Sequence, residues 1–295
     1  AVVAVSLALA AGVAGAAEEA KPEAKPEEKG PNTGAVSVLG GMDWTTDYYF
    51  RGILQADSGW ILQPYGEITF KVLENLGPLN ALGLTLGTWN SLHGGETGIE
   101  GGSASVDPKM WYESDFYTKV GAVLFEDLST AIIYTAYMSP NDRFQTVQEL
   151  AFSAGYNDSK LLGPFALNPN ALLAFEVKGQ ADAGDHKGVY LQFGIAPGLT
   201  VLEKTDFPIA LSVPVNFAFS LSDYYEFGTG DDDGFGWWSV GVAAAMPLKF
   251  IPPRFGSWQV KGSVTMLRIE GDNLKAVNNN DSTEWIGAVG LAFTY

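Results

Sequence analysis

The sequence predicts an all-β protein, a transmembrane, antiparallel, up-and-down β-barrel of 12 strands. Three observations lead to this fold class. From residue 36 onward, segment after segment alternates apolar and polar side chains with the period of two that a strand requires. Charged residues make up 17% of the chain, whereas a soluble domain carries about 25%. Aromatic residues gather near the segment ends, as in the girdles of membrane barrels: Trp44, Tyr48, Phe50, Trp60, Trp111, Tyr112, Trp237, Trp238, Trp258, Trp285 and Tyr295.

Most of the strand-like segments reach the roughly 9–11 residues that a tilted strand needs to cross a bilayer. An even number of strands places both ends of the barrel on one side. The segments are 36–51, 59–72, 81–91, 110–124, 129–138, 145–157, 171–180, 187–197, 208–222, 235–246, 256–268 and 283–295.

The two faces of these segments are chemically different, and we expect the apolar face to contact lipid. In the first segment, Trp44, Tyr48 and Phe50 lie on the apolar face, with Asp43 and Asp47 on the other. The segments 59–72, 208–222 and 283–295 separate in the same way, whereas 129–138 is apolar on both faces and has no predicted lumen side.

The connections fall into two alternating sets. The polar set, rich in Gly, Asp, Asn and Ser, comprises 52–58, 92–109, 139–144, 181–186, 223–234 and 269–282. The other set, with more Pro and apolar residues, comprises 73–80, 125–128, 158–170, 198–207 and 247–255. Since membrane barrels have longer loops outside and turns in the periplasm, we expect the polar set to be extracellular. The long apolar turns would then lie at the membrane interface or hold a partner.

The N-terminal part differs from the barrel region, 35–295. Residues 1–16 are uncharged and rich in Ala and Val, which predicts a secretory signal peptide whose true start is missing; a membrane-anchoring helix is the alternative. Residues 17–34, rich in Pro, Glu and Lys, predict a disordered periplasmic tail. The tail is a spacer or a tether to a periplasmic or cell-wall partner.

Composition restricts the chemistry. The chain has no cysteine, so it has neither disulfides nor thiolate metal sites. Its formal net charge of −17 argues against nucleic acid as a partner and suits cations. No cofactor is expected. Asp231, Asp232 and Asp233, with Glu226 nearby, offer oxygen ligands for a weakly bound calcium ion or form a solvated acidic loop.

The stretch from Thr46 to Asp57 resembles the first-strand signature of the TorF-like family of bacterial porins, which is roughly Ser-x-Tyr-x-Phe-Arg-Gly-x-Ser-Gln-Ser. The resemblance is carried by Tyr48, Phe50, Arg51, Gly52 and Gln55, while Asp47, Leu54 and Ala56 stand at its three serine positions. It implies an outer-membrane barrel with a porin-like role and does not indicate a substrate.

Charged side chains on strands should face the lumen, because a Lys or Arg at mid-depth on the lipid face costs about 2–4 kcal/mol. They form a mildly cation-preferring constriction or, alternatively, ion-pair ladders that fill the interior. Arg51 lines the mouth or pairs with Asp47. The candidates are Asp43, Asp47, Arg51, Glu67, Lys71, Glu113, Asp115, Lys119, Glu149, Glu176, Lys178, Lys261 and Glu284.

The function predicted first is a porin-like channel in the cell outer membrane for passive diffusion of small polar solutes or ions. A non-conducting structural anchor or scaffold is the second hypothesis, and a loop-based hydrolase the third. We expect no enzyme, because the two histidines, His93 and His186, fall in predicted solvated loops. Expected partners are outer-membrane lipid and the barrel-assembly machinery, for which the C-terminal Tyr295 resembles the terminal-strand signal.

Overall fold

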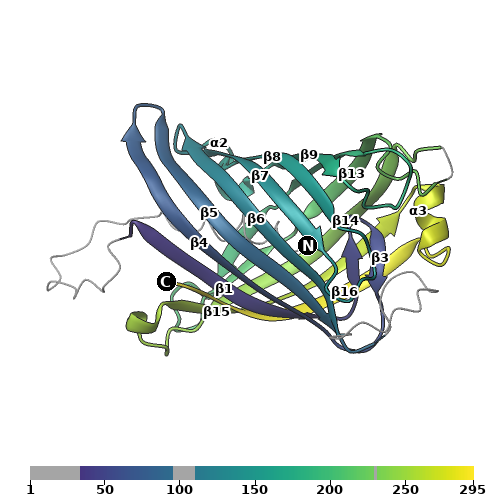
Figure 1. The fold of residues 1–295 in the computed structure, drawn as a ribbon. Helices are drawn as coiled ribbons and strands as arrows, with labels where there is room; N and C mark the ends of the chain where they lie inside the picture. The colour runs from purple at the N-terminus through teal and green to yellow at the C-terminus, as the bar shows by residue number, and fades with distance from the viewer. Residues whose placement is uncertain (1–33, 96–109, 229–230) are drawn as a thin grey trace, which may run out of the picture.

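The computed structural model describes residues 34–95, 110–228 and 231–295 (Figure 1). The predicted signal segment and, except for Gly34, the predicted tail lie outside the described residues, so both stay predictions. In the described part of the chain, no helix is long and apolar enough to cross a membrane.

A closed antiparallel barrel of 12 strands confirms the predicted fold class. Strand β1 closes the barrel by pairing with β16, with Thr45 opposite Ala288. The strands are β1 (Val36–Thr45), β4 (Ile61–Leu76), β5 (Leu79–His93), β6 (Trp111–Leu124), β7 (Leu128–Met138), β8 (Val147–Tyr156), β9 (Asn170–Lys178), β10 (Val189–Ile195) continued by β11 (Gly198–Val201), β12 (Ile209–Ser212) continued by β13 (Val215–Ser222), β14 (Phe235–Pro247), β15 (Ser257–Ile269) and β16 (Thr283–Thr294).

Two strands of the barrel are interrupted at prolines. Pro197 separates β10 from β11, and Pro214 separates β12 from β13. Proline has no N–H to donate to the neighbouring strand, so the ladder breaks locally while the chain continues in the same direction.

The remaining elements are short. Strands β2 (Tyr48–Phe50) and β3 (Ile53–Ala56) pair only with each other and not with the barrel. The helices are α2 (Ser159–Leu162), η1 (Gly163–Phe165), η2 (Pro253–Phe255) and α3 (Asp272–Val277). The sequence had shown no helical period, and these helices are too short to produce one.

The barrel has two different ends (Figure 1). The terminal end carries Val36, Tyr295, α2 and η2. The loop end carries β2, β3 and α3. In the described residues, the strand ends that adjoin the predicted polar loops lie at the loop end, and the connections predicted as apolar turns lie at the terminal end.

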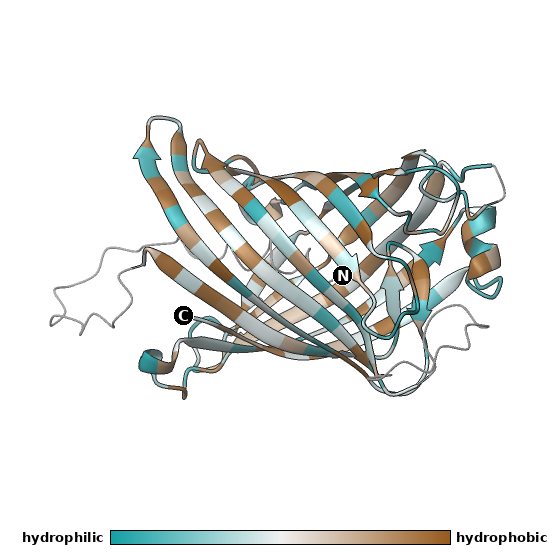
Figure 2. Ribbon diagram, in the orientation of Figure 1, coloured by the Kyte–Doolittle hydropathy of each residue, from teal (hydrophilic) through white to brown (hydrophobic). Residues whose placement is uncertain are grey.

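The outer surface is an apolar belt, visible as brown bands that alternate with paler residues along the strands (Figure 2). Phe116, Ile132 and Trp285 are 55%, 50% and 64% exposed. Such a surface is far more apolar than a soluble monomer tolerates, because contiguous patches there rarely exceed a few hundred Å². In β7, Ile132 and Tyr134 face outward and Ile133 packs inside. This settles the one segment whose faces the sequence did not separate.

The prediction for the first strand was wrong beyond Thr45. The wall strand ends there, and the chain folds back into the loop end of the barrel as the β2–β3 hairpin. Tyr48 and Phe50, expected to face lipid, are only 3% and 7% exposed and pack in the interior.

Candidate functional site

The β2–β3 hairpin, Tyr48–Ala56, fills part of the lumen at the loop end and is called the plug below. Its two-residue turn consists of Arg51 and Gly52, both with positive φ, 49° and 87°. Two positive φ values are typical of a tight hairpin turn, but an arginine in this region costs about 1–2 kcal/mol relative to glycine. A Cβ at position 52 would collide with the ring of Trp237, so the tip fits closely against the wall.

The Arg51 guanidinium is held in a buried cage formed by Tyr137, Glu149, Tyr190 and Tyr224. Its Nη1 and Nη2 donate to the two carboxylate oxygens of Glu149, each at 2.6 Å. Nη1 also donates to the hydroxyl of Tyr224 at 2.7 Å, and the guanidinium lies 4.3 Å from the ring centroid of Tyr190. Arg51 and Glu149 are 4% and 1% exposed.

Both carboxylate oxygens of Glu149 accept more than one hydrogen bond. Besides Arg51, Glu149 accepts hydrogen bonds from the hydroxyls of Tyr137 at 3.0 Å and Tyr224 at 3.1 Å. A buried ion pair is stable only when its remaining hydrogen-bonding capacity is satisfied, as it is here. Arg51 therefore pairs with Glu149, and not with Asp47.

Side chains from several parts of the barrel hold the rest of the plug. Asn278, just after α3, accepts from the N–H of Leu54 at 2.8 Å and donates to the carbonyl of Gly52 at 2.7 Å. The hydroxyl of Tyr225 donates to the carbonyl of Arg51 at 2.9 Å. These contacts are polar, and none is a backbone ladder bond between the plug and the barrel sheet.

Two buried clusters surround the plug and leave the loop half of the lumen filled. One includes Ile53, Tyr190, Trp237 and Leu274, and the other includes Tyr48, Phe50, Trp89, Tyr112 and Tyr137. Aromatic side chains make up four of the twelve buried residues of the first cluster and five of the eight of the second.

The terminal half of the lumen is lined differently. Many of its inward positions, identified by register, are small: Gly41, Gly83, Gly121, Ala131, Ser153, Gly155, Gly194, Ala243, Ala245, Ser263, Ala288 and Ala292. Larger side chains, among them Leu39, Tyr65 and Leu172, share this face, and the Tyr65 ring lies over Gly41. Barrels of eight strands are filled by their side chains, whereas wider ones leave space. A wall of 12 strands encloses a wider interior than one of eight.

A strip of paired charges crosses the middle of this wall. Lys261 lies 3.0 Å from Asp43, and Lys119 lies 3.6 Å from Glu67. The hydroxyl of Tyr117 donates to Glu67 at 2.7 Å. Lys119 points inward and yet is 30% exposed, so the lumen beside it is open to solvent. The structure brings these predicted lumen charges together as pairs.

A second pair of predicted residues, Glu113 and Asp115, lies behind the plug. Both are 3% exposed, and the hydroxyl of Tyr48 donates to Glu113 at 2.8 Å. Within the described residues neither acid forms an ion pair with a basic side chain, and Asp115 Oδ1, Trp89 Nε1 and His93 Nδ1 have no hydrogen-bond partner there.

Three predicted lumen residues lie near the two ends of the barrel. Asp47 follows β1 at the loop end and accepts from Thr46 Oγ1 at 2.5 Å. Lys71 lies towards the terminal mouth and pairs with Glu74 at 2.9 Å. Glu284 lies at the loop end of β16, near its start.

The lumen prediction for Lys178 was wrong. A register irregularity in the β8–β9 pair places this residue opposite Gln148, whose neighbours Val147 and Glu149 face inward. Lys178 therefore faces outward. Glu176 stays inside and accepts from the N–H groups of Ala181 and Gly188, at 2.5 and 2.7 Å.

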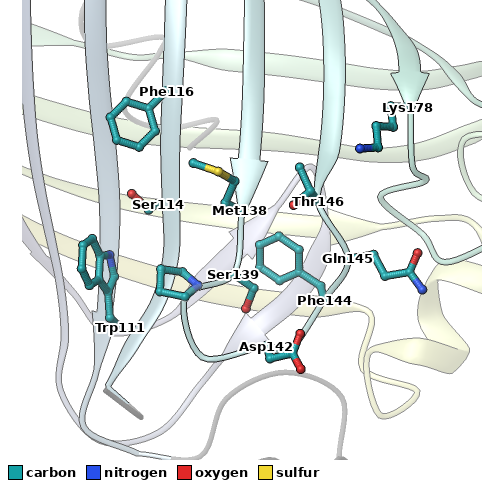
Figure 3. Close-up of a pocket in the computed structure, with 11 residues that line it drawn as sticks. Trp111, Ser114, Phe116, Met138, Ser139, Asp142, Phe144, Gln145, Thr146 and Lys178 are labelled. Carbon is teal, nitrogen blue, oxygen red and sulfur yellow. The ribbon is translucent and has the colours of Figure 1, made fainter. Parts of the chain in front are cut away.

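Lys178 borders a recess of about 660 Å³ at the loop end of the outer wall (Figure 3). Because Phe116 belongs to the apolar belt, the recess opens outside the barrel and not into the lumen. Its lining comes from β6, β7, the β7–β8 connection and β9: Trp111, Ser114, Phe116, Met138, Ser139, Pro140, Asp142, Phe144, Gln145, Thr146 and Lys178.

The expectation of a solvated His93 was wrong. This residue ends β5, is 2% exposed and stacks on Tyr112 with 4.6 Å between ring centroids. Its Nε2 lies 2.7 Å from Ser91 Oγ. A hydrolytic triad needs a third group on Nδ1 and an accessible nucleophile. Here Nδ1 has no described partner and Ser91 is 0% exposed, so this arrangement does not favour hydrolysis.

The acidic residues predicted to bind calcium have other contacts in the structure. Asp232 accepts from Ser220 Oγ at 2.6 Å and from the N–H of Tyr225 at 3.0 Å. Asp233 accepts from the N–H of Leu274 at 2.9 Å. These hydrogen bonds shape the loop, and calcium binding stays a prediction. A different group of possible ligand atoms, on His186, Asp223 and Glu226, lies within 4.8 Å of one another.

His186 is exposed at the loop end and contacts the buried carboxylate of Glu226, with 3.1 Å between Nδ1 and Oε1. The hydrogen bond to Glu226 and its charge raise the pKa of His186 above its ordinary value of 6.5. A raised folded-state pKa stabilises the loop at pH values below 6.5 and ceases to do so as the pH rises through the folded-state pKa.

We therefore expect Glu226→Gln to lower the pKa of His186. The chain has only two histidines, so an NMR pH titration of the imidazole signals measures the shift directly. His93 serves as the internal control, because it is buried elsewhere and should titrate unchanged. An unaltered His186 titration in the variant would show that Glu226 is not its partner.

Sequence reasoning missed the plug, the cage tyrosines and Asn278. The alternation of β1 continues through Tyr48 and Phe50, so no change of period marks the end of the wall strand. One local signal was present in Arg51-Gly52, since glycine favours the positive φ of a tight turn. The positions of Tyr190 and Tyr224 around Arg51 depend on contacts over long sequence separations.

No family model matches the chain, and no curated protein matches its sequence. Solved structures are similar in the arrangement of strands. An outer membrane channel from Pseudomonas putida F1 superposes with a TM-score of 0.47 and 9% identity, over 92% of this chain and 100% of that one. The beta domain of the Bordetella autotransporter BrkA gives 0.43 and 11%, over 89% and 99%. The NanC porin gives 0.38 and 10%, over 88% and 99%.

Proposed function

We propose that this protein is an outer-membrane channel for small polar solutes or ions, and that the structure represents its closed state. The observation that carries the proposal is the contrast between the two halves of the lumen. The terminal half has many small residues in its wall and a partly exposed ion pair, Glu67–Lys119, whereas the plug fills the loop half.

The apolar belt supports a membrane location, and the lengths of the connections support the orientation. Outer-membrane barrels have long extracellular loops and shorter periplasmic turns, so the loop end would be extracellular. The turns at the terminal end expose large apolar side chains, among them Phe165 at 79% and Phe250 at 76%. These suit the membrane interface, although a periplasmic partner would use the same side chains.

The filled loop half favours a second candidate function, a non-conducting anchor or scaffold. Planar-bilayer recording separates the two functions. A channel gives rare openings in the wild-type protein and frequent ones when the plug is released. A well-folded barrel that stays silent with the plug released would contradict the channel and leave the anchor.

Selectivity should depend on the ion pairs of the lumen wall. We expect Asp43→Asn to shift permeation towards anions, because it leaves the positive charge of Lys261 unpaired 3.0 Å away. The matched variant Lys261→Met should shift it towards cations, and the double variant should return close to the wild type. Reversal potentials in a salt gradient measure all three. Reversal potentials equal to that of the wild type in all three variants would show that the Asp43–Lys261 pair does not line the narrowest part of the ion path.

A further inference from the structure

The cage around Arg51 is built without the plug. Glu149 comes from β8, Tyr190 from β10 and Tyr224 from the connection after β13, and Tyr137 adds a hydroxyl from β7. All four side chains are held by the barrel wall or its loops. The wall therefore forms a receptor, and the plug inserts a single side chain into it.

The receptor matches a guanidinium group more closely than any other cation. The two oxygens of Glu149 accept two parallel N–H bonds, and the ring of Tyr190 lies against the planar face. Bidentate pairing combined with stacking requires a planar, forked donor, and an ammonium ion offers neither.

The plug that supplies this guanidinium shares no backbone ladder with the barrel wall. Its strands pair only with each other, and its tip keeps Arg51 at a φ of 49°, a conformation that a glycine would adopt without strain. The strained turn places the guanidinium in the cage.

We propose that the cage is a binding site for solutes that carry a guanidinium group, such as arginine, and that Arg51 occupies it as a tethered substitute. The inference rests on the proposed channel function, since the solute reaches the cage through the lumen. A free guanidinium competes with Arg51 for Glu149, and its binding stabilises the undocked plug. The solute thereby opens its own path.

The effective concentration of the tethered Arg51 sets how much free arginine is needed to compete with it. A group on a short tether has an effective concentration on the order of millimolar or higher, so free arginine must exceed this concentration to act on the wild-type protein. Arg51→Ala removes the competitor and exposes the cage at much lower arginine concentration.

The experiment compares arginine with citrulline, which has the same length and a neutral urea group in place of the guanidinium. In planar bilayers, arginine should raise the open fraction of the wild-type channel several-fold, and citrulline should not. In the Arg51→Ala variant the effect of arginine should reverse, so that it reduces the current by occupying the open lumen. In Arg51→Ala/Glu149→Gln both solutes should be inactive.

A binding measurement separates the cage from the channel. Arginine should raise the thermal unfolding temperature of Arg51→Ala in detergent, with no effect from citrulline. If neither protein conducts but this shift is present, the channel function fails and the cage stands. If the channel conducts but arginine and citrulline act alike on Arg51→Ala, the cage proposal is overturned.

Should Arg51→Ala fail to fold, Arg51→Lys replaces it. Lysine keeps the charge and loses the bidentate geometry, so arginine should open this variant at lower concentration than the wild type. Equal responses of Arg51→Lys to arginine and citrulline would also overturn the proposal.

Discussion

Replacing Arg51 with alanine is expected to release the plug and convert a mostly closed barrel into a conducting one. The substitution leaves Glu149, 1% exposed, as an unpaired buried charge. Breaking a buried pair by removing one partner costs about 3–5 kcal/mol. The plug contributes no strand to the barrel sheet, so this cost falls on plug docking while the wall stays closed. Bilayer conductance and hydrogen exchange of the plug amides measure the two consequences.

The control is an ion pair of the same type at an exposed place. Lys71 and Glu74 are 47% and 53% exposed, and such pairs contribute about 0–1 kcal/mol. Lys71→Ala should therefore leave conductance and plug protection unchanged. Plug amides that remain protected in Arg51→Ala would show that the other contacts, such as Asn278 with Gly52, suffice to hold it.

Placing an arginine at position 132 should strongly destabilise the barrel. Ile132 is half exposed in the apolar belt of β7, and an Arg at the bilayer midplane of a barrel costs about 2–4 kcal/mol. We expect a lower denaturant midpoint for refolding into lipid vesicles and weaker heat-modifiable gel mobility.

The neighbouring residue provides the matched control. Ala131 points into the lumen, opposite Gly121, so Ala131→Arg should fold almost normally and instead narrow the path. The two substitutions lie at adjacent positions. Ile132→Arg should lower stability, whereas Ala131→Arg should lower conductance. Equal destabilisation by both would contradict the assignment of the two faces of β7.

The wall of the barrel could be predicted from sequence because it depends on local periodicity. In β4 the inward set, including Gln63 and Glu67, alternates with the outward set that ends at Phe70 and Val72, and the register places Gln63 opposite the lumen residue Asp43. A membrane barrel requires apolar lipid-facing residues to alternate with lumen-facing residues along the whole membrane-spanning part of each strand. Each strand can therefore be predicted from its own sequence.

The site could be predicted only in part. The inward direction of Asp43, Glu67, Lys119, Glu149 and Lys261 followed from the same periodicity. Their partners did not, because Arg51 meets Glu149 over 98 residues of chain. The plug continues the alternation of the wall strand although it lies in the lumen. Alternation shows which side chains are apolar, but it does not show whether lipid or protein surrounds them.

The long range of these contacts also determines when the plug can form during assembly. Arg51 is made early, but its partners Glu149 and Tyr224 follow 98 and 173 residues later, and contacts of such separation form slowly. The docked plug also needs Trp237 of β14 and Asn278 after α3, which lie still later in the chain. Docking of the plug is therefore a late folding event, and protection of its amides would report the fraction of molecules that have completed assembly.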